Sequence, residues 1–261
     1  MHAFAEKLQM RARRSCRSVE SAYDDCIIKP PEGLGVRLVS AGPLFFLLAI
    51  LWAQSGCSAT GSSVALHEAV RLHHDEGQLH VQAQVACTRS DLEQVCCARG
   101  TREHESLLVT NAPASAVQAG LLALGLQPGQ PGFWRQGSAG ALEEQPPQGS
   151  AVEMRVRWQE GGVQREAPVD AWLDDRRSGP DALRFVFAGS RFVRTPQGER
   201  FAADLSGSIV GLVTFGDEVV ACAQVVPDRV DVAPPRWRAR SAVMPPEGTP
   251  VTMILRRPVA P

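Results

Sequence analysis

The sequence lacks each of the short motifs that mark common enzyme classes. It has no Walker phosphate loop, no dinucleotide-binding glycine fingerprint, no GxSxG nucleophile elbow and no HExxH zinc motif. His67-Glu68 and His104-Glu105 begin as HExxH does, but neither has a histidine four residues after the first. CxxC is also absent, so a thioredoxin-like redox pair is not supported. The sequence therefore indicates none of these activities.

Lysine is nearly absent, and the remaining charge is balanced. Lys7 and Lys29 are the only lysines, and arginine carries almost all other positive charge. The formal net charge is −1, and the arginines are spread out rather than clustered with aromatic residues. A nucleic-acid surface needs a basic stripe that neutralises phosphates. We therefore expect no nucleic-acid partner.

The apolar run of residues 39–53 is too short for a typical membrane span of about 20 residues, but it suits the apolar core of a signal peptide. Residues 54–58, which read QSGCS, resemble a bacterial lipoprotein cleavage site in which the thiol of Cys57 receives the lipid. We therefore expect a membrane-anchored lipoprotein of the bacterial cell envelope, facing the periplasm or the outside. An uncleaved N-terminal anchor is the alternative.

Four segments follow from this interpretation. Residues 1–35 are a doubtful N-terminal extension, because a signal peptide normally begins shortly before its apolar core; a start codon near residue 34 or 36 would remove it. Residues 36–56 form the lipoprotein-type signal peptide, residues 57–77 a tether, and residues 78–261 one folded domain.

An exported chain can form disulfides. The cysteines left in the expected domain are Cys87, Cys96, Cys97 and Cys222. A bridge from Cys87 to Cys97 would close a small loop around Leu92 and Glu93. Other pairings among the four, and buried unpaired thiols, are the alternatives, because the sequence cannot choose between connectivities.

Alternation of apolar and polar residues predicts that most of the domain is β-strand. The expected strands are residues 79–87, 107–110, 151–159, 163–169, 183–188 and 251–256, with two or three more within 201–226. One helix is expected after Asn111 and Pro113, with Val117, Leu121 and Leu124 on its buried face and its end at Gly125. The order is not βαβ, so we predict an α+β fold: a single mostly-β domain with one main helix packed on a largely antiparallel or mixed sheet.

The densest group of reactive residues, 96–106, lies between the first two expected strands. Cys97 could act as a nucleophile with His104 as its base, or His104 could bind a metal with carboxylate support from Glu105. In an extended backbone, however, His104 points away from Glu103 and Glu105, which disfavours a three-ligand site.

A structural role for this block is the preferred interpretation. Thr101, Arg102 and Glu105 would form a buried network of hydrogen bonds and ion pairs that fixes the loop between two strands.

Two further groups are interpreted as non-catalytic. His67, His73, His74 and His80 match no closed zinc site, so no metal is expected there. The tryptophans are assigned to packing, with a carbohydrate platform at Trp134 or Trp237 as the alternative.

Seven segments together carry a family resemblance: Leu92-Glu93, Cys97, Gly100 to Leu107, Leu121 to Gly125, Pro128 to Gly132, Phe187 to Phe192 and Pro246 to Val251. They resemble the YdjY domain of bacterial exported proteins over roughly residues 78–256. The motif residues are Glu93, Thr101, Arg102, Glu103, His104 and Glu105. The resemblance implies a secreted or lipid-anchored envelope protein.

Some relatives carry a cysteine run of iron–sulfur type. Residues 183–226 of this chain hold only Cys222, so we expect no cofactor and disfavour an iron–sulfur cluster.

These observations predict a lipid-anchored envelope protein whose YdjY-like domain has a non-catalytic binding or assembly role. Its partners would be the membrane, through the lipid on Cys57, and an unidentified envelope protein or ligand. The alternative is a metal- or thiol-dependent envelope enzyme that uses Cys97, His104 and Glu105.

Overall fold

The computed structural model describes residues 63–137, 142–177, 183–228 and 231–258. Residues Ala59–Pro261 form one compact unit. The expected signal peptide, the N-terminal extension and Cys57 lie outside the described residues. No helix among the described residues is both long and apolar enough to cross a membrane.

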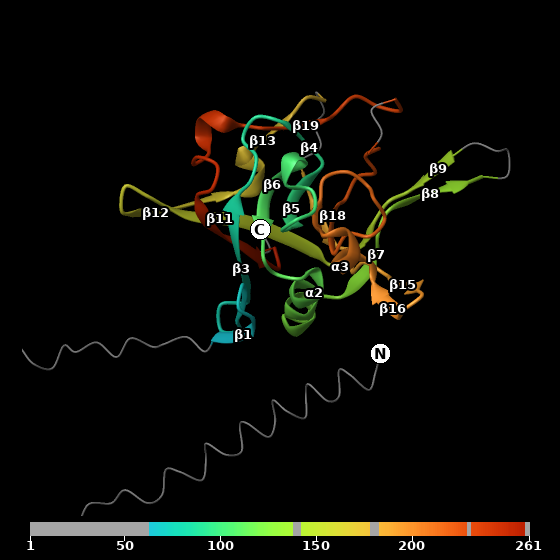
Figure 1. Ribbon diagram of the computed structural model, residues 1–261, viewed down its shortest axis with the longest axis horizontal. Coiled ribbons are helices and arrows are strands. Elements are labelled where there is room, and N and C mark those ends of the chain that lie inside the picture. The colour runs from blue at the N-terminus through green and yellow to red at the C-terminus, as the bar shows by residue number, and fades with distance from the viewer. Residues whose placement is uncertain (1–62, 138–141, 178–182, 229–230, 259–261) are drawn as a thin grey trace, which may run out of the picture. The chain divides into compact units, whose positions relative to one another are not determined.

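Eight strands form a closed barrel, which is the main feature of the fold (Figure 1). In order around the barrel they are β3 (Gln78–Val85), β20 (Pro250–Arg256), β11 (Ala151–Glu160), β14 (Phe185–Phe187), β18 (Val220–Cys222), β17 (Ser208–Gly211), β5 (Gln94–Ala98) and β6 (Ser106–Thr110). The ring closes because β6 also pairs with β3, with Gln84 opposite Val109 and Val85 opposite Leu108. Neighbouring strands are antiparallel except for the parallel pairs β17–β18 and β5–β6.

The prediction of an α+β fold with a helix packed on a sheet is therefore wrong. The described residues are mostly β, with 48% of them in strands and 14% in helices, and the main sheet is a barrel. Along one edge, β3 pairs with β20 over its whole length; along the other it pairs with β2 near its start and with β6 at its end. Alternation specifies which face of a strand is buried, but it does not specify this change of partner.

Three further strands extend the barrel sheet. β1 (Ser63–His67) pairs with β2 (Val70–His73), β2 pairs with β3, and β12 (Val163–Pro168) forms a hairpin with β11. Residues 63–73 were expected in the tether, but they belong to the sheet because Val70 and Leu72 are buried. The two strands expected at residues 151–159 and 163–169 are confirmed, and Gly161-Gly162 forms the turn between them.

Smaller elements surround the barrel. β4 (Asp91–Leu92), β13 (Leu173–Asp175) and β19 (Trp237–Ala239) form a three-stranded sheet. The two-stranded pairs are β7 (Pro128–Gln130) with β10 (Gln148–Gly149), β8 (Phe133–Gln136) with β9 (Leu142–Gln145), and β15 (Phe192–Thr195) with β16 (Gly198–Phe201). The short helices are α3 (Ala202–Ser206), η3 (Glu103–Glu105), η4 (Val169–Trp172) and η5 (Ser241–Val243). Figure 1 shows the β8–β9 hairpin projecting away from the barrel.

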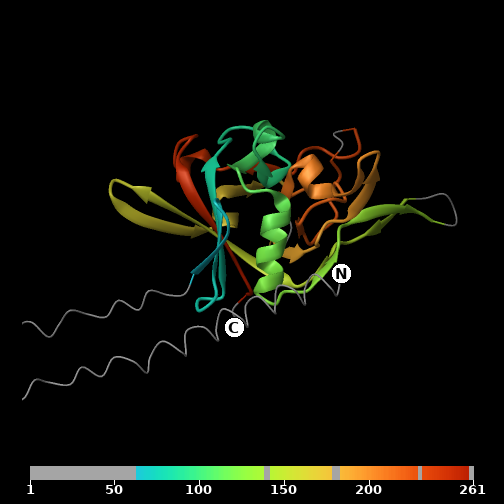
Figure 2. The same cartoon turned by 60° about the horizontal axis from the view of Figure 1, so that its bottom comes forward.

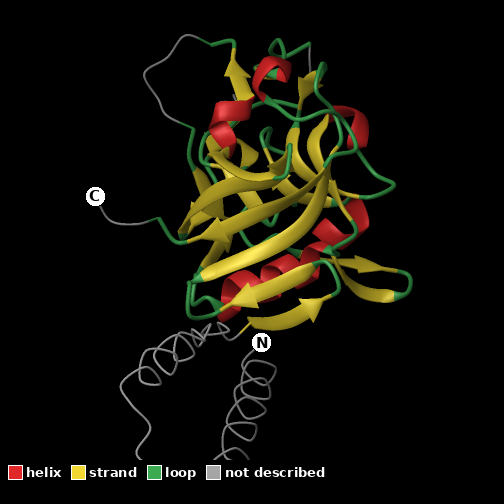
Figure 3. Ribbon diagram, turned by 90° about the vertical axis from the view of Figure 1, so that its left-hand side faces the viewer, coloured by secondary structure: helices red, strands yellow, loops and turns green. Residues whose placement is uncertain are grey.

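The main helix of the described residues is α2 (Ala114–Ala123), which runs beside the long strands (Figures 2 and 3). Val117 and Leu121 are buried as predicted, whereas Leu124, the residue after the last turn, is only half-buried. Gly120 lies against β3 so closely that a Cβ atom there would be 2.3 Å from Cδ1 of Leu79. The helix ends at Gly125, whose φ of 75° suits glycine. The missing side chain at Gly120 therefore permits the close approach of α2 to β3.

Alternation along the long strands separates the core from an outer polar face. The buried side chains include Leu79, Val81, Ala83 and Val85 on β3, Val152, Met154 and Val156 on β11, and Val251, Met253 and Leu255 on β20. Gln82 and Gln159 point the other way and are exposed, while Arg157 and Thr252 are half-buried. The barrel therefore presents polar side chains from three strands on its outside.

Candidate functional site

The block that attracted attention in the sequence forms a tight return between two parallel strands. Parallel neighbours usually need a crossover of about a dozen residues or more, whereas residues 99–105 alone connect β5 to β6. Gly100 has a φ of 82°, which favours glycine, and Thr101 Oγ1 donates a hydrogen bond of 2.6 Å to the carbonyl oxygen of Ala98. The composition of this block therefore has a structural explanation.

Residues 103–105 form one turn of 3-10 helix rather than extended backbone. Oε1 of Glu103 accepts a 2.6 Å hydrogen bond from the N–H of Gly100, and this bond holds the pKa of the Glu103 carboxyl below its usual value. The N–H of Glu105 donates to the carbonyl oxygen of Arg102 at 3.2 Å. Because the turn is helical, the predicted separation of His104 from the two glutamates onto opposite faces does not apply.

Cys97 is fully buried on β5. Burial raises the pKa of its thiol, and hydrogen bonds from the side chains of Ser106 and Thr101 offset this only in part. A cysteine nucleophile reacts as the thiolate. The surroundings of Cys97 therefore favour the unreactive thiol.

His104 lies at the surface, with 79% of its side chain exposed and Nε2 3.6 Å from Oε2 of Glu105. The structure thus brings His104 to Glu105, while Cys97 contacts Ser106 and Thr101. Arg102 lies on the other side of Glu105, with Nη1 3.9 Å from Oε1. The predicted ion pair between Arg102 and Glu105 is therefore present, but it is partly exposed rather than buried.

Glu93 joins this group from the strand side. Its N–H donates to the carbonyl oxygen of Glu105 at 2.9 Å. Burial, the negative charge of Glu105 and a side-chain hydrogen bond with it raise the pKa of Glu93 to about 7. The family-motif residues Glu93 and Glu105 are therefore a carboxyl pair in which a proton is retained near neutral pH.

Glu218 is a buried acid that the sequence analysis missed. Its carboxylate accepts hydrogen bonds from the N–H groups of Phe215 and Gly216, and burial raises its pKa to about 7. The ring of Phe215 lies 3.9 Å from the guanidinium carbon of Arg102, which connects Glu218 to the return. A glutamate directly before the buried pair Val219-Val220 was the signal that could have identified it.

The expected Cys87–Cys97 disulfide is not formed. Cys87, Cys96, Cys97 and Cys222, the cysteines of the described residues, are all free, and none lie at disulfide distance. Cys87 Sγ instead accepts a 3.4 Å hydrogen bond from the N–H of Ser90. The described residues contain no group of three or more histidine, cysteine or acidic side chains placed to hold a metal.

Two of the histidines interpreted as non-catalytic, His73 and His80, contact each other on the sheet. The rings of His73 and His80 lie 4.0 Å apart between centroids, and His80 Nε2 is 2.8 Å from Oε1 of Gln78. Burial, followed by the positive charges of His73 and Arg157, lowers the pKa of His80 to about 4. His80 is therefore a neutral side chain of the β3 face near pH 7.

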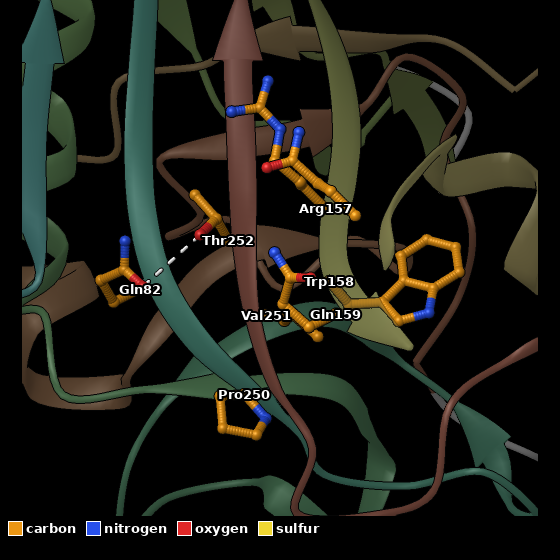
Figure 4. A pocket seen from close by; sticks show the side chains of 8 residues that line it. Gln82, Arg157, Trp158, Gln159, Pro250, Val251 and Thr252 are labelled. Atoms are coloured by element: carbon orange, nitrogen blue, oxygen red, sulfur yellow. Dashed lines mark hydrogen bonds between the residues drawn. The ribbon is translucent and has the colours of Figure 1, made fainter. Parts of the chain in front are cut away.

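A shallow depression of about 210 Å³ lies over β3, β20, β11 and β12 (Figure 4). It is lined by Gln82, Arg157, Trp158, Gln159, Gln164, Pro250, Val251 and Thr252. Thr252 Oγ1 donates a 3.4 Å hydrogen bond to Oε1 of Gln82, the dashed line in Figure 4. The lining is rich in amides, and none of its residues was a candidate in the sequence analysis. Because it combines strands far apart in the chain, local patterns could not reveal it.

The comparisons with known proteins give one match. Residues 70–256 match the family model described as the YdjY domain. No curated protein and no solved structure matches the chain.

Proposed function

The chain belongs to the YdjY domain family, and we propose that it is a lipid-anchored protein of the bacterial cell envelope that acts by binding rather than by catalysis. The burial of the Cys97 thiol supports the non-catalytic part of the proposal. A nucleophilic cysteine needs access to its substrate and a base that forms the thiolate. Cys97 lacks access to a substrate because it is fully buried on a barrel strand. It also lacks His104 as a base, because His104 lies at the surface beside Glu105.

Alkylation tests the state of this thiol. Iodoacetamide should modify Cys97 on the order of 1,000-fold more slowly in the folded full-length chain than in guanidinium, because reaction requires an opening that costs about 4 kcal/mol. Mass spectrometry of the peptide that contains Cys97 measures the rate. A thiol introduced by Ser115→Cys, on an exposed position of α2, is the control and should react at similar rates in both states.

Rapid alkylation of Cys97 in the folded protein would contradict the proposal. If that reactivity were also lost in His104→Ala, the competing interpretation, a thiol-dependent envelope enzyme, would be favoured.

The N-terminal sequence supports the anchor. The apolar run of residues 39–53 and the cysteine that follows it match the order of elements in a lipoprotein signal. The described strands all follow Cys57 in the sequence, so cleavage before Cys57 would leave the barrel complete. One acyl chain gives only marginal membrane binding, so the several chains of a lipidated N-terminal cysteine suit a stable anchor.

Lipid labelling tests the anchor. The full chain, expressed in a bacterium supplied with radiolabelled palmitate, should incorporate label and sediment with the membranes. Cys57→Ala should lose both properties, whereas Cys16→Ala, a cysteine in the N-terminal extension, should keep them. Palmitate that stays on the Cys57→Ala chain would exclude Cys57 as the lipidation site.

A further inference from the structure

The outer face of the barrel carries a row of polar side chains that crosses four strands. Gln82 on β3 is opposite Thr252 on β20, Thr252 is opposite Arg157 on β11, and Arg157 is opposite Glu166 on β12. Residues directly opposite each other in antiparallel strands point to the same face of the sheet. The four side chains therefore share one face, and Gln82, Thr252 and Arg157 line the depression of Figure 4.

A second row lies two residues further along the same strands. Gln159 follows Arg157 on β11 and is opposite Gln164 on β12. Pro250 on β20 is opposite Gln84 on β3. Side chains two residues apart on a strand share a face, so Gln159 and Gln164 line the depression next to the first row. The result is a face dominated by glutamine amides.

The charged groups at this face neutralise one another. Arg157 Nη2 lies 2.9 Å from Oε2 of Glu166, and Arg155 Nε lies 2.5 Å from Oε1 of the same carboxylate. Arg155 also approaches Glu153 at 4.0 Å, and Glu153 pairs with Arg256 at 2.5 Å. An anionic ligand would have to compete with these carboxylates for the guanidinium groups, and a cation would have to compete with the guanidinium groups for the carboxylates.

The remaining groups select a neutral, polar ligand. Gln82, Gln159 and Gln164 each carry an amide that both donates and accepts hydrogen bonds, and all three are exposed. An apolar ligand would find only Pro250, Val251 and the half-buried Trp158 in the lining. An extended peptide would find no ladder to join here, because the backbone groups of β20 already pair with β3 on one side and β11 on the other.

We propose that this depression binds a neutral glycan, whose hydroxyl groups exchange hydrogen bonds with Gln82, Gln159 and Gln164. The inference rests on the binding role proposed above and deepens it by naming the class of ligand. Sugar hydroxyls supply donors and acceptors together without charge, which matches the chemistry of side-chain amides. At about 210 Å³, the depression is smaller than a typical drug-sized pocket, so it suits contact with a short stretch of an oligosaccharide.

Saturation-transfer NMR on the full chain in dodecylphosphocholine micelles tests the proposal, since this detergent carries no sugar. The probes are N-acetylchitotetraose, cellotetraose and maltotetraose, with a heparin tetrasaccharide as the charged comparison. At least one neutral probe should show saturable binding. Gln159→Ala and Gln164→Ala should each weaken that binding up to about tenfold, the effect of losing one or two hydrogen bonds.

Gln136→Ala is the matched control, because Gln136 is an exposed strand glutamine on β8 outside the depression. It should leave the dissociation constant unchanged, and circular dichroism should confirm that all variants are folded. Three results would overturn the proposal: no neutral probe binds, the lining variants bind like the control, or the heparin probe binds more tightly than every neutral one. Each of these results would refute glycan binding. The proposed function would still stand if the same chain incorporated palmitate and its Cys97 thiol resisted alkylation.

Discussion

Three carboxyl groups near the β5–β6 return hold their protons differently because their surroundings differ. Glu103 is half-buried and its pKa is lowered, chiefly by the hydrogen bond from the N–H of Gly100. Glu218 also accepts backbone hydrogen bonds, but burial outweighs them and raises its pKa to about 7. Glu93 reaches about 7 through burial together with the negative charge of Glu105. Desolvation is therefore the largest cause of the raised pKa at both Glu218 and Glu93.

The raised pKa of Glu218 predicts a pH-dependent stability. Below about pH 4.5 the carboxyl is protonated in both the folded and the unfolded chain, so its full contribution to the free energy of unfolding is present. Between about 4.5 and 7 the folded protein keeps a proton that the unfolded chain has lost, and the free energy of unfolding decreases as the pH rises. At 1.36 kcal/mol per pKa unit, the decrease from this group is about 3 kcal/mol.

Glu218→Gln should remove this decrease, because an amide does not ionise in this range. Urea unfolding at pH 4.5 and pH 8 measures it. Between these two pH values, the free energy of unfolding of the variant should fall by about 3 kcal/mol less than that of the unmodified chain. Glu199→Gln, at an exposed position of β16, is the control and should leave the pH dependence unchanged. If the pH dependence of Glu218→Gln equalled that of the control, the assigned titration would be wrong.

At the scale of elements, small residues decide where segments can meet. The return between β5 and β6 is short because Gly100 takes a positive φ, and it packs beside Gly207, where a Cβ atom would lie 2.4 Å from Oγ1 of Thr101. Helix α2 meets β3 at Gly120 for the same reason. Close packing of this kind leaves no room for an added methyl group.

Gly120→Ala should therefore destabilise the protein by about 1–3 kcal/mol, although alanine is a better helix former than glycine by about 1 kcal/mol. The added Cβ would overlap Leu79, which is fully buried. The free energy of unfolding in urea measures the change. Ser115→Ala, at an exposed position of the same helix, should change it by no more than about 0.5 kcal/mol.

A double-mutant cycle identifies the cause. In a Leu79→Ala background, the added methyl group at position 120 should no longer destabilise the chain, because the side chain that it overlaps is gone. A stabilising effect of Gly120→Ala in the unmodified chain would show that α2 does not approach β3 as closely as described.

At the scale of the whole molecule, closure of the barrel determines which residues act together. The ladder between β3 and β6 completes the ring and removes the free edges that an open sheet would have at this point. Closure also holds β3, β20 and β11 side by side, so that Gln82, Thr252 and Arg157 share one outer face. Residues on this face come from both ends of the domain sequence.

The sequence by itself determined most local features. Alternation identified β3 and β11, an apolar run identified β6, and the turn residues before them identified β12 and β20. Apolar spacing identified α2 with Val117 and Leu121 buried. The block around Thr101 and Arg102 identified the family, which the match over residues 70–256 confirms. These features depend on neighbours within a few residues, so periodicity and turn chemistry are sufficient to predict them.

The tertiary structure alone decided the rest. It closed the sheet into a barrel, made residues 63–73 part of it, left Cys87 and Cys97 unpaired, buried Glu218 and assembled the outer polar face. Each of these depends on contacts between segments far apart in the chain. The free energy of such contacts arises from burial and pairing that form only once the strands meet, and hydrophobic alternation is compatible with more than one set of partners.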